Sequence, residues 1–98
     1  MPDYTISLSN SDTLHCRFWD DEGVVFNSLS GETHLLDGVG AAILKKISAN
    51  PIPQKALLAY IQSIFEFEHG THIEKLLDSI ILEYQKLGLI ASRENPAA

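Results

Sequence analysis

Residues 30–50 have the sequence SGETHLLDGVGAAILKKISAN, and within them the chain changes from a strand pattern to a helical one. Glu32–Leu36 follows the turn residues Asn27–Gly31 and is expected to form a strand. Asp37 is then a suitable N-cap for a helix that continues to Ala49. Apolar residues recur at helical spacing in this segment: Val39, Ile43, Leu44 and Ile47. The change from strand to helix is therefore expected at Asp37.

Two more strands are expected before this turn. Leu14–Trp19 is rich in strand-forming residues, and Val24–Phe26 follows it after the acidic turn at residues 20–23. Short connections of this kind favour antiparallel pairing of consecutive strands. The three strands should therefore form a three-stranded antiparallel sheet. Upstream, the alternation in residues 4–9 suits a short edge strand or an ordered lead-in.

Two more helices are expected after Asn50. Pro53 can begin a helix that continues to about Phe65, since a proline at the first helical position sacrifices no intrahelical hydrogen bond. A longer helix begins near His72, continues to Leu87 and ends at Gly88, a residue suited to a left-handed C-cap. Three strands followed by three helices predict an α+β fold of the winged helix-turn-helix kind, with the helices on one face of the sheet.

The length and the single cysteine limit the kind of protein. Ninety-eight residues suit one domain, expected over residues 1–92, with a flexible tail over 93–98. Cys16 has no partner for an intramolecular disulfide, and no apolar stretch approaches the roughly 20 residues of a membrane span. We therefore expect a cytoplasmic protein without a membrane partner.

The net charge bears on the class of partner. A formal charge of −6 repels a phosphate backbone, and the basic side chains are scattered rather than clustered. A nucleic-acid partner is therefore not expected. At this length a binding module is favoured over an enzyme.

No combination of residues indicates a metal, a cofactor or a catalytic group. His69 and His72 are three apart, but no cysteine or histidine pair at zinc-binding spacing accompanies them. Ser30, His34 and Asp37 are close in sequence, yet nothing indicates an oxyanion hole beside them. We expect neither a cofactor nor catalysis.

Several short stretches carry a resemblance to a known family. They are Phe18-Trp19-Asp20, Val24-Val25-Phe26-Asn27, Ser30-Gly31-Glu32-Thr33-His34-Leu35-Leu36 and Ala41-Ala42-Ile43-Leu44. On these stretches the chain resembles the PqqD-like family, and more narrowly the PqqD relatives of systems that contain an HPr-kinase-related protein. The later helices match the family in pattern only.

The resemblance implies a small, non-catalytic peptide chaperone of the winged-helix kind, also called a precursor-peptide recognition element. Such proteins hold the leader segment of a ribosomally made peptide and present it to a modifying enzyme. In that family the peptide adds a strand to the third strand of the sheet, beside the last helix. Here this implies a site at Glu32, Thr33, His34, Leu35 and Leu36. The subgroup suggests an HPr-kinase-related enzyme as partner.

The physics of a sheet edge supports the same kind of site. An edge strand has unpaired amides and carbonyls, which an extended peptide can pair with. Alternation places Glu32, His34 and Leu36 on one face and Thr33 with Leu35 on the other, and either face could meet the helices. His34 is either a structural hydrogen-bonding residue or a peptide contact.

The helical candidates come from the last helix. At about 100° per residue, one stripe is the expected core face: Leu76, Leu77, Ile80, Tyr84 and Leu87. Ile81 is expected at the edge of this stripe. The candidates for the peptide-facing side are Asp78, Ile81, Leu82 and Gln85. In the alternative interpretation, Ile81 completes the core and Leu82 is an ordinary exposed leucine.

Two other functions stay open from the sequence. A winged-helix DNA-binding regulator could have the same architecture, although it should show a basic helix face. A structural subunit could cover its apolar surface with a second copy of itself, so both a monomer and a homodimer are possible. Phe18 and Trp19 point to opposite faces of their strand, and exposure of either one would mark a partner surface.

Overall fold

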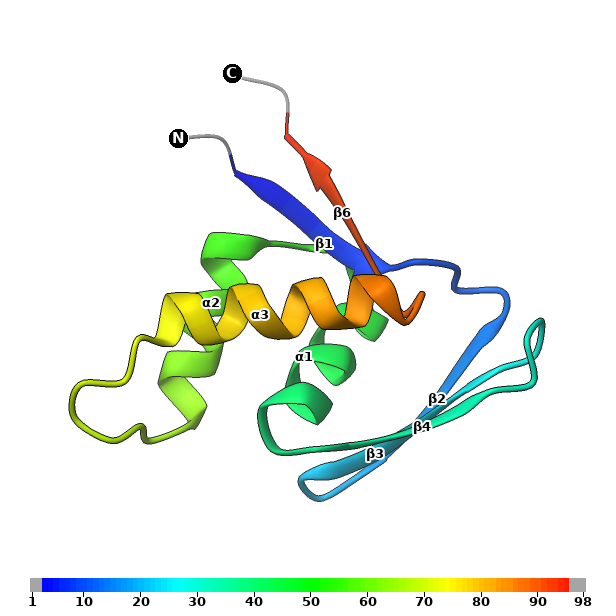
Figure 1. Cartoon of the computed structure of the whole chain (residues 1–98), viewed down its shortest axis with the longest axis horizontal. Helices are drawn as coiled ribbons and strands as arrows, with labels where there is room; N and C mark the ends of the chain where they lie inside the picture. The colour runs from blue at the N-terminus through cyan, green and yellow to red at the C-terminus, as the bar shows by residue number, and fades with distance from the viewer. Residues whose placement is uncertain (1–2, 96–98) are drawn as a thin grey trace.

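The computed structural model describes residues 3–95 and has an α+β architecture (Figure 1). The elements in chain order are β1 (Tyr4–Leu8), β2 (Leu14–Trp19), β3 (Glu22–Asn27), β4 (Thr33–Asp37), α1 (Gly38–Ala49), β5 (Ile52–Pro53), α2 (Gln54–Ile64), α3 (Ile73–Lys86) and β6 (Ile90–Glu94). The predicted core of the fold, three antiparallel strands followed by three helices, is confirmed.

The strands β2, β3 and β4 form one antiparallel sheet in that order. Val25 lies opposite Cys16 on one side and His34 on the other, and its side chain is fully buried. Because side chains alternate along each strand, this column of residues defines the inner face of the sheet. Leu14 and Leu36 are buried on the same face. The strand after the turn is Thr33–Asp37, so Glu32 belongs to the turn.

A second sheet joins the two ends of the chain. Its strand order is β5-β1-β6, and β1 pairs antiparallel with β6 along its whole length (Figure 1). Residues 93–98 were expected to be a flexible tail, but Arg93 and Glu94 lie in β6 opposite Thr5 and Tyr4. That expectation was wrong for these two residues, because the pairing partner lies about 90 residues away. Residues 96–98 lie outside the described part.

The core lies between the two sheets and the helices. Helix α1 packs against β1, against all three strands of the β2-β3-β4 sheet and against α2. Its side chains Ile43 and Leu44 are completely buried, as are Leu57 and Ile61 of α2. Helix α1 is therefore the central element of the hydrophobic core.

The helix ends agree closely with the expected ones. Asp37 is the N-cap residue of α1 and has an extended backbone, although its side chain makes no capping hydrogen bond. Gly88 follows α3 with a φ of 78°, which is the left-handed conformation expected for this glycine. The amide of Leu89 then donates to the carbonyl of Tyr84 and ends the helix.

The core face of α3 differs from the predicted one. Leu77 and Ile81 are the buried residues of this helix, whereas Leu87 is exposed. The buried stripe is therefore rotated toward Ile81, and the elements that pack against α3 are β6 and α2. Leu76 and Ile80 are only half-buried.

Candidate functional site

The outer edge of β4 is an unpaired strand edge. Strand β4 pairs with β3 on one side, and no strand in residues 3–95 pairs with its other side. Such an edge offers a row of backbone donors and acceptors to a further strand. In Figure 1, β4 leads directly into α1 and shares its sheet with β2 and β3 only.

Two hydrogen bonds establish which backbone groups of β4 face this edge. At one end the amide of Asn27 donates to the carbonyl of Glu32 (2.8 Å), and at the other the amide of Gly38 donates to the carbonyl of Asp21 (3.0 Å). In an antiparallel pair, hydrogen-bonded and non-hydrogen-bonded residue pairs alternate.

The hydrogen bonds at the two ends of the β3–β4 pair predict the same alternation of backbone groups along β4. His34 and Leu36 direct their amides and carbonyls to β3, as Glu32 does with its carbonyl. The Glu32 amide donates to the Ser30 hydroxyl instead (3.2 Å). The amides and carbonyls that point to the open edge therefore belong to Thr33 and Leu35.

The side chains of β4 alternate between the core and solvent. Leu36 is buried and His34 half-buried on the inner face, whereas Thr33 and Leu35 lie on the outer face. Leu35 is 83% exposed. Of the two faces of this strand, the helices therefore cover the one that carries His34 and Leu36. Leu36 is a core residue. Its side chain is buried and its backbone groups pair with β3, so neither can contact an added strand.

Helix α3 contacts the first turn of α1, which directly follows β4, through Tyr84. A Cβ on Gly40 would lie 2.1 Å from the Tyr84 hydroxyl oxygen, so the glycine permits this close approach. Burial, and then the nearby carboxylates of Glu83 and Asp37, raise the pKa of Tyr84. A neutral phenol therefore lies beside the junction of β4 and α1.

One flank of α3 next to Tyr84 is apolar and incompletely covered. We call Leu76, Ile80 and Leu87 the apolar flank of α3; the first two are half-buried and Leu87 is 43% exposed. At 100° per residue these three side chains lie within about 40° of one another and next to Tyr84. The apolar flank is thus adjacent to the contact that α3 makes with the first turn of α1.

The helical residues predicted for the peptide site lie elsewhere on α3. Ile81 is a core residue with 5% exposure, so its expected position at the edge of the core was wrong. Leu82 and Gln85 are exposed. Asp78 accepts a hydrogen bond from the side chain of Gln54 in α2 (2.6 Å) and lines a cavity whose other lining residues come from β1, α2, α3 and the residue before β1.

Other exposed groups lie on the outer face of the β2-β3-β4 sheet. Phe18 packs against the core while Trp19 is 45% exposed, as their opposite directions required. Phe26 is also exposed, and its ring stacks on that of His15 with centroids 6.3 Å apart. This face therefore carries apolar and aromatic side chains next to the open edge.

The described residues contain no cluster of possible metal ligands. Within residues 3–95, no cluster of three or more histidine, cysteine or acidic side chains could hold a metal ion. The only cysteine, Cys16, is half-buried, and burial raises the pKa of its thiol. A protonated thiol is a poor nucleophile.

Within residues 3–95, no helix is long and apolar enough to cross a membrane.

Sequence reasoning missed two groups of residues around α3. Leu76, Ile80 and Leu87 were assigned to the core, since a helical pattern cannot show which part of an apolar stripe is left uncovered. A cavity on the other flank of α3 was missed entirely, because its lining comes from segments far apart in sequence.

Comparison with known proteins gives one informative match. No family model matches the chain, and no curated protein matches it. Among solved structures, the chain is similar to TbiB1 in complex with the TbiA(beta) leader peptide, with a TM-score of 0.70. The match has 20% sequence identity and covers 94% of this chain and 98% of that one. The two proteins therefore share a fold over nearly their whole length.

Proposed function

We propose that this protein is a non-catalytic adaptor that binds the leader segment of a ribosomally made precursor peptide and presents it to a modifying enzyme. The observation that carries the proposal is the open edge of β4, where Thr33 and Leu35 direct their backbone groups outward. Two further facts support it: the shared fold with a protein solved in complex with a leader peptide, and the resemblance in residues 30–36.

Strand addition at this edge explains how affinity and selectivity are divided. A peptide in extended conformation pairs its backbone with Thr33 and Leu35, which supplies affinity for any sequence. Its side chains alternate: those beside His34 and Leu36 point toward the helices, and those beside Leu35 point to the outer face. Apolar peptide residues on the inner side would pack near Tyr84 and the apolar flank of α3, which supplies selectivity.

The modifying enzyme is the second partner in this proposal. The resemblance to PqqD relatives suggests an enzyme related to HPr kinase. The exposed side chains of Trp19 and Phe26 lie on the outer face of the same sheet, which a peptide strand added at β4 would extend. An enzyme bound there would contact adaptor and peptide together.

Amide chemical shifts test the proposed function directly. The probe is a synthetic leader segment from a short precursor-like reading frame beside this gene, titrated into ¹⁵N-labelled protein. We expect the largest shifts at Thr33, Leu35 and Tyr84. The same peptide with a proline at its central position serves as control, since it lacks one pairing amide. If saturating leader peptide left Thr33–Asp37 unshifted, the strand-addition proposal would be wrong.

A further inference from the structure

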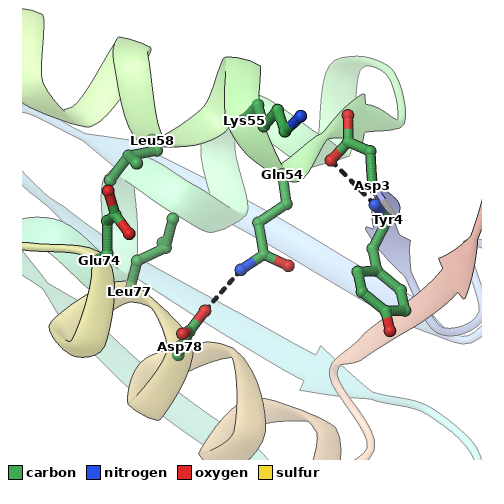
Figure 2. A pocket seen from close by; sticks show the side chains of 8 residues that line it. All are labelled: Asp3, Tyr4, Gln54, Lys55, Leu58, Glu74, Leu77 and Asp78. Atoms are coloured by element: carbon green, nitrogen blue, oxygen red, sulfur yellow. Dashed lines mark hydrogen bonds between the residues drawn. The ribbon is translucent and has the colours of Figure 1, made fainter. Parts of the chain in front are cut away.

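A cavity of about 530 Å³ lies beside the first half of α3 (Figure 2). Its lining comes from the start of β1, the first turns of α2 and the first half of α3: Asp3, Tyr4, Gln54, Lys55, Leu58, Glu74, Leu77 and Asp78. The volume is within the roughly 300–1,000 Å³ of ligand pockets. No residue of β4 lines this cavity, so it is separate from the proposed strand-addition site.

The cavity has an apolar part and an acidic rim. Leu77 is buried and Leu58 half-buried, and both side chains line the cavity between α2 and α3 (Figure 2). Three carboxylates and one ammonium surround them, so the formal charge of the lining is −2 at neutral pH. A ligand that fits both parts has a positive charge and an apolar stem.

The residues that line the cavity extend from α3 and α2 at one end to β1 at the other. In Figure 2, Leu58 and Glu74 lie at one end, and Asp3 and Tyr4 at the other. Between them the side-chain amide of Gln54 donates to Asp78 at 2.6 Å, which joins α2 to α3. A carboxylate accepts about four hydrogen bonds, so Asp78 can bind a further donor.

The backbone of β1 adds a feature that suits a polypeptide rather than a small amine. The amide of Asn95 donates to the carbonyl of Asp3 (2.8 Å), so Asp3 directs its backbone groups toward the β6 side. By the alternation of an antiparallel pair, Tyr4 directs its amide and carbonyl to the opposite side. Its amide there donates to the carboxylate of Asp3 (2.9 Å).

That side of β1 is open beside the cavity. Strand β5 pairs with β1 only at Thr5 and Ile6 and ends at Pro53, and the next residue, Gln54, lines the cavity. The carbonyl of Tyr4 therefore faces the space between β1 and the start of α2. A backbone acceptor and a carboxylate rim together suit an extended segment that carries a basic side chain.

We propose that this cavity binds a short basic segment of a partner polypeptide, with one lysine or arginine side chain entering between α2 and α3. Its aliphatic stem packs on Leu58 and Leu77, and its cation lies beside the carboxylates of Glu74 and Asp78. The charge of the cavity lining complements this ligand, and the surrounding protein, at −6 overall, attracts it further. The adaptor thus has a second polypeptide contact, independent of the β4 edge.

Two matched peptides test the proposal. The first is acetyl-Ala-Leu-Arg-Leu-Ala-amide, and the second has glutamine in place of the arginine. We expect the arginine peptide to shift the amides of Tyr4, Gln54 and Asp78 in ¹⁵N-labelled protein, with weaker binding as salt is raised. The glutamine peptide should bind about two- to fivefold more weakly, since it lacks the charge. Equal binding of the two peptides would overturn the proposal.

Charge-neutralising substitutions test the site itself. The double variant Glu74→Gln/Asp78→Asn keeps shape and hydrogen-bonding atoms but removes two charges, and should weaken the arginine peptide roughly fivefold or more. Glu83→Gln is the control, because Glu83 is an exposed carboxylate of the same helix that does not line the cavity. Equal loss of affinity per removed charge in the control and in the double variant would show a nonspecific charge effect and overturn the proposal.

Two further outcomes separate this proposal from the others. Arginine amide alone should bind at least tenfold more weakly than the peptide, and equal affinity would mean that the occupant is a small cation and not a polypeptide. If the arginine peptide shifts only Thr33–Asp37, the cavity proposal fails while strand addition stands. If it shifts the cavity residues while a leader peptide leaves β4 unchanged, strand addition fails and the cavity proposal stands.

Discussion

A proline at position 35 should weaken leader-peptide binding without disturbing the fold. The Leu35 amide points to the open edge of β4 and takes no part in the pairing with β3, and its side chain is 83% exposed. Proline removes this amide and fills its place with ring atoms. Edge strands tolerate proline at positions whose amide faces solvent. Leu35→Pro therefore acts on the added strand and not on the sheet.

The size of the effect follows from one hydrogen bond and one steric contact. A net hydrogen bond contributes about 0.5–1.5 kcal/mol, which corresponds to about a 2- to 12-fold change in affinity. The ring also displaces the peptide carbonyl that the amide would bind, so we expect at least the upper end of this range. Leu35→Ala keeps the amide and removes only a cross-strand side-chain contact of about 0.2–1 kcal/mol. It should weaken binding by at most about fivefold.

Calorimetric titration of the leader peptide into the two variants and the original protein measures this difference. Thermal unfolding of each variant serves as the control for the fold, and both melting temperatures should stay close to the original. Equal affinities for Leu35→Pro and the original protein, with an intact fold, would refute backbone pairing at β4. His34→Pro should unfold the protein, since the His34 amide pairs with β3.

Further predictions concern stability. Gly40→Ala should lower the free energy of unfolding by about 1–3 kcal/mol in urea titrations, because its Cβ would lie 2.1 Å from the Tyr84 hydroxyl oxygen. In a protein that also carries Tyr84→Leu, Gly40→Ala should change the free energy of unfolding very little. If Gly40→Ala lowered the free energy of unfolding just as much in the Tyr84→Leu protein, the contact between the two residues would be contradicted. Ile81→Ala should cost about 2–5 kcal/mol and Leu82→Ala less than about 0.5 kcal/mol, since only the first side chain is buried. Raised pKa values of Cys16 and Tyr84 mean that the folded state holds these protons more tightly, so stability is unaffected below about pH 8 and falls as pH rises through 9 and 10. The double variant Cys16→Ser/Tyr84→Phe should lose less stability at alkaline pH. An unchanged dependence of stability on pH would contradict the raised pKa values.

Local patterns were sufficient for most of the individual elements. The strand-to-helix change at Asp37 and the helix end at Gly88 depend on residues within one turn, so the sequence predicts them well. Alternation in Leu14–Trp19 likewise predicts a strand whose Phe18 is covered and whose Trp19 is exposed. Each of these features is set by neighbours within a few residues.

Features that join distant segments were not predictable in this way. Residues 93–94 were expected to be a tail, yet they pair with Tyr4 and Thr5 from the other end of the chain. The cavity beside Asp78 combines β1, α2 and α3, and no pattern along the sequence relates these three segments. Their juxtaposition depends on how the helices pack over the two sheets.

The sequence by itself determined the strand order of the β2-β3-β4 sheet, the three helices and, to within one residue at each end, the strand predicted at Glu32–Leu36, because turns and periodicity are local properties. Only the tertiary structure decided which face of β4 meets the helices and which backbone groups of Thr33 and Leu35 stay open. It also decided that Ile81 belongs to the core and Asp78 to the cavity beside α2. A helical stripe is ambiguous by about one residue on either side, and only the elements packed against it determine its buried centre.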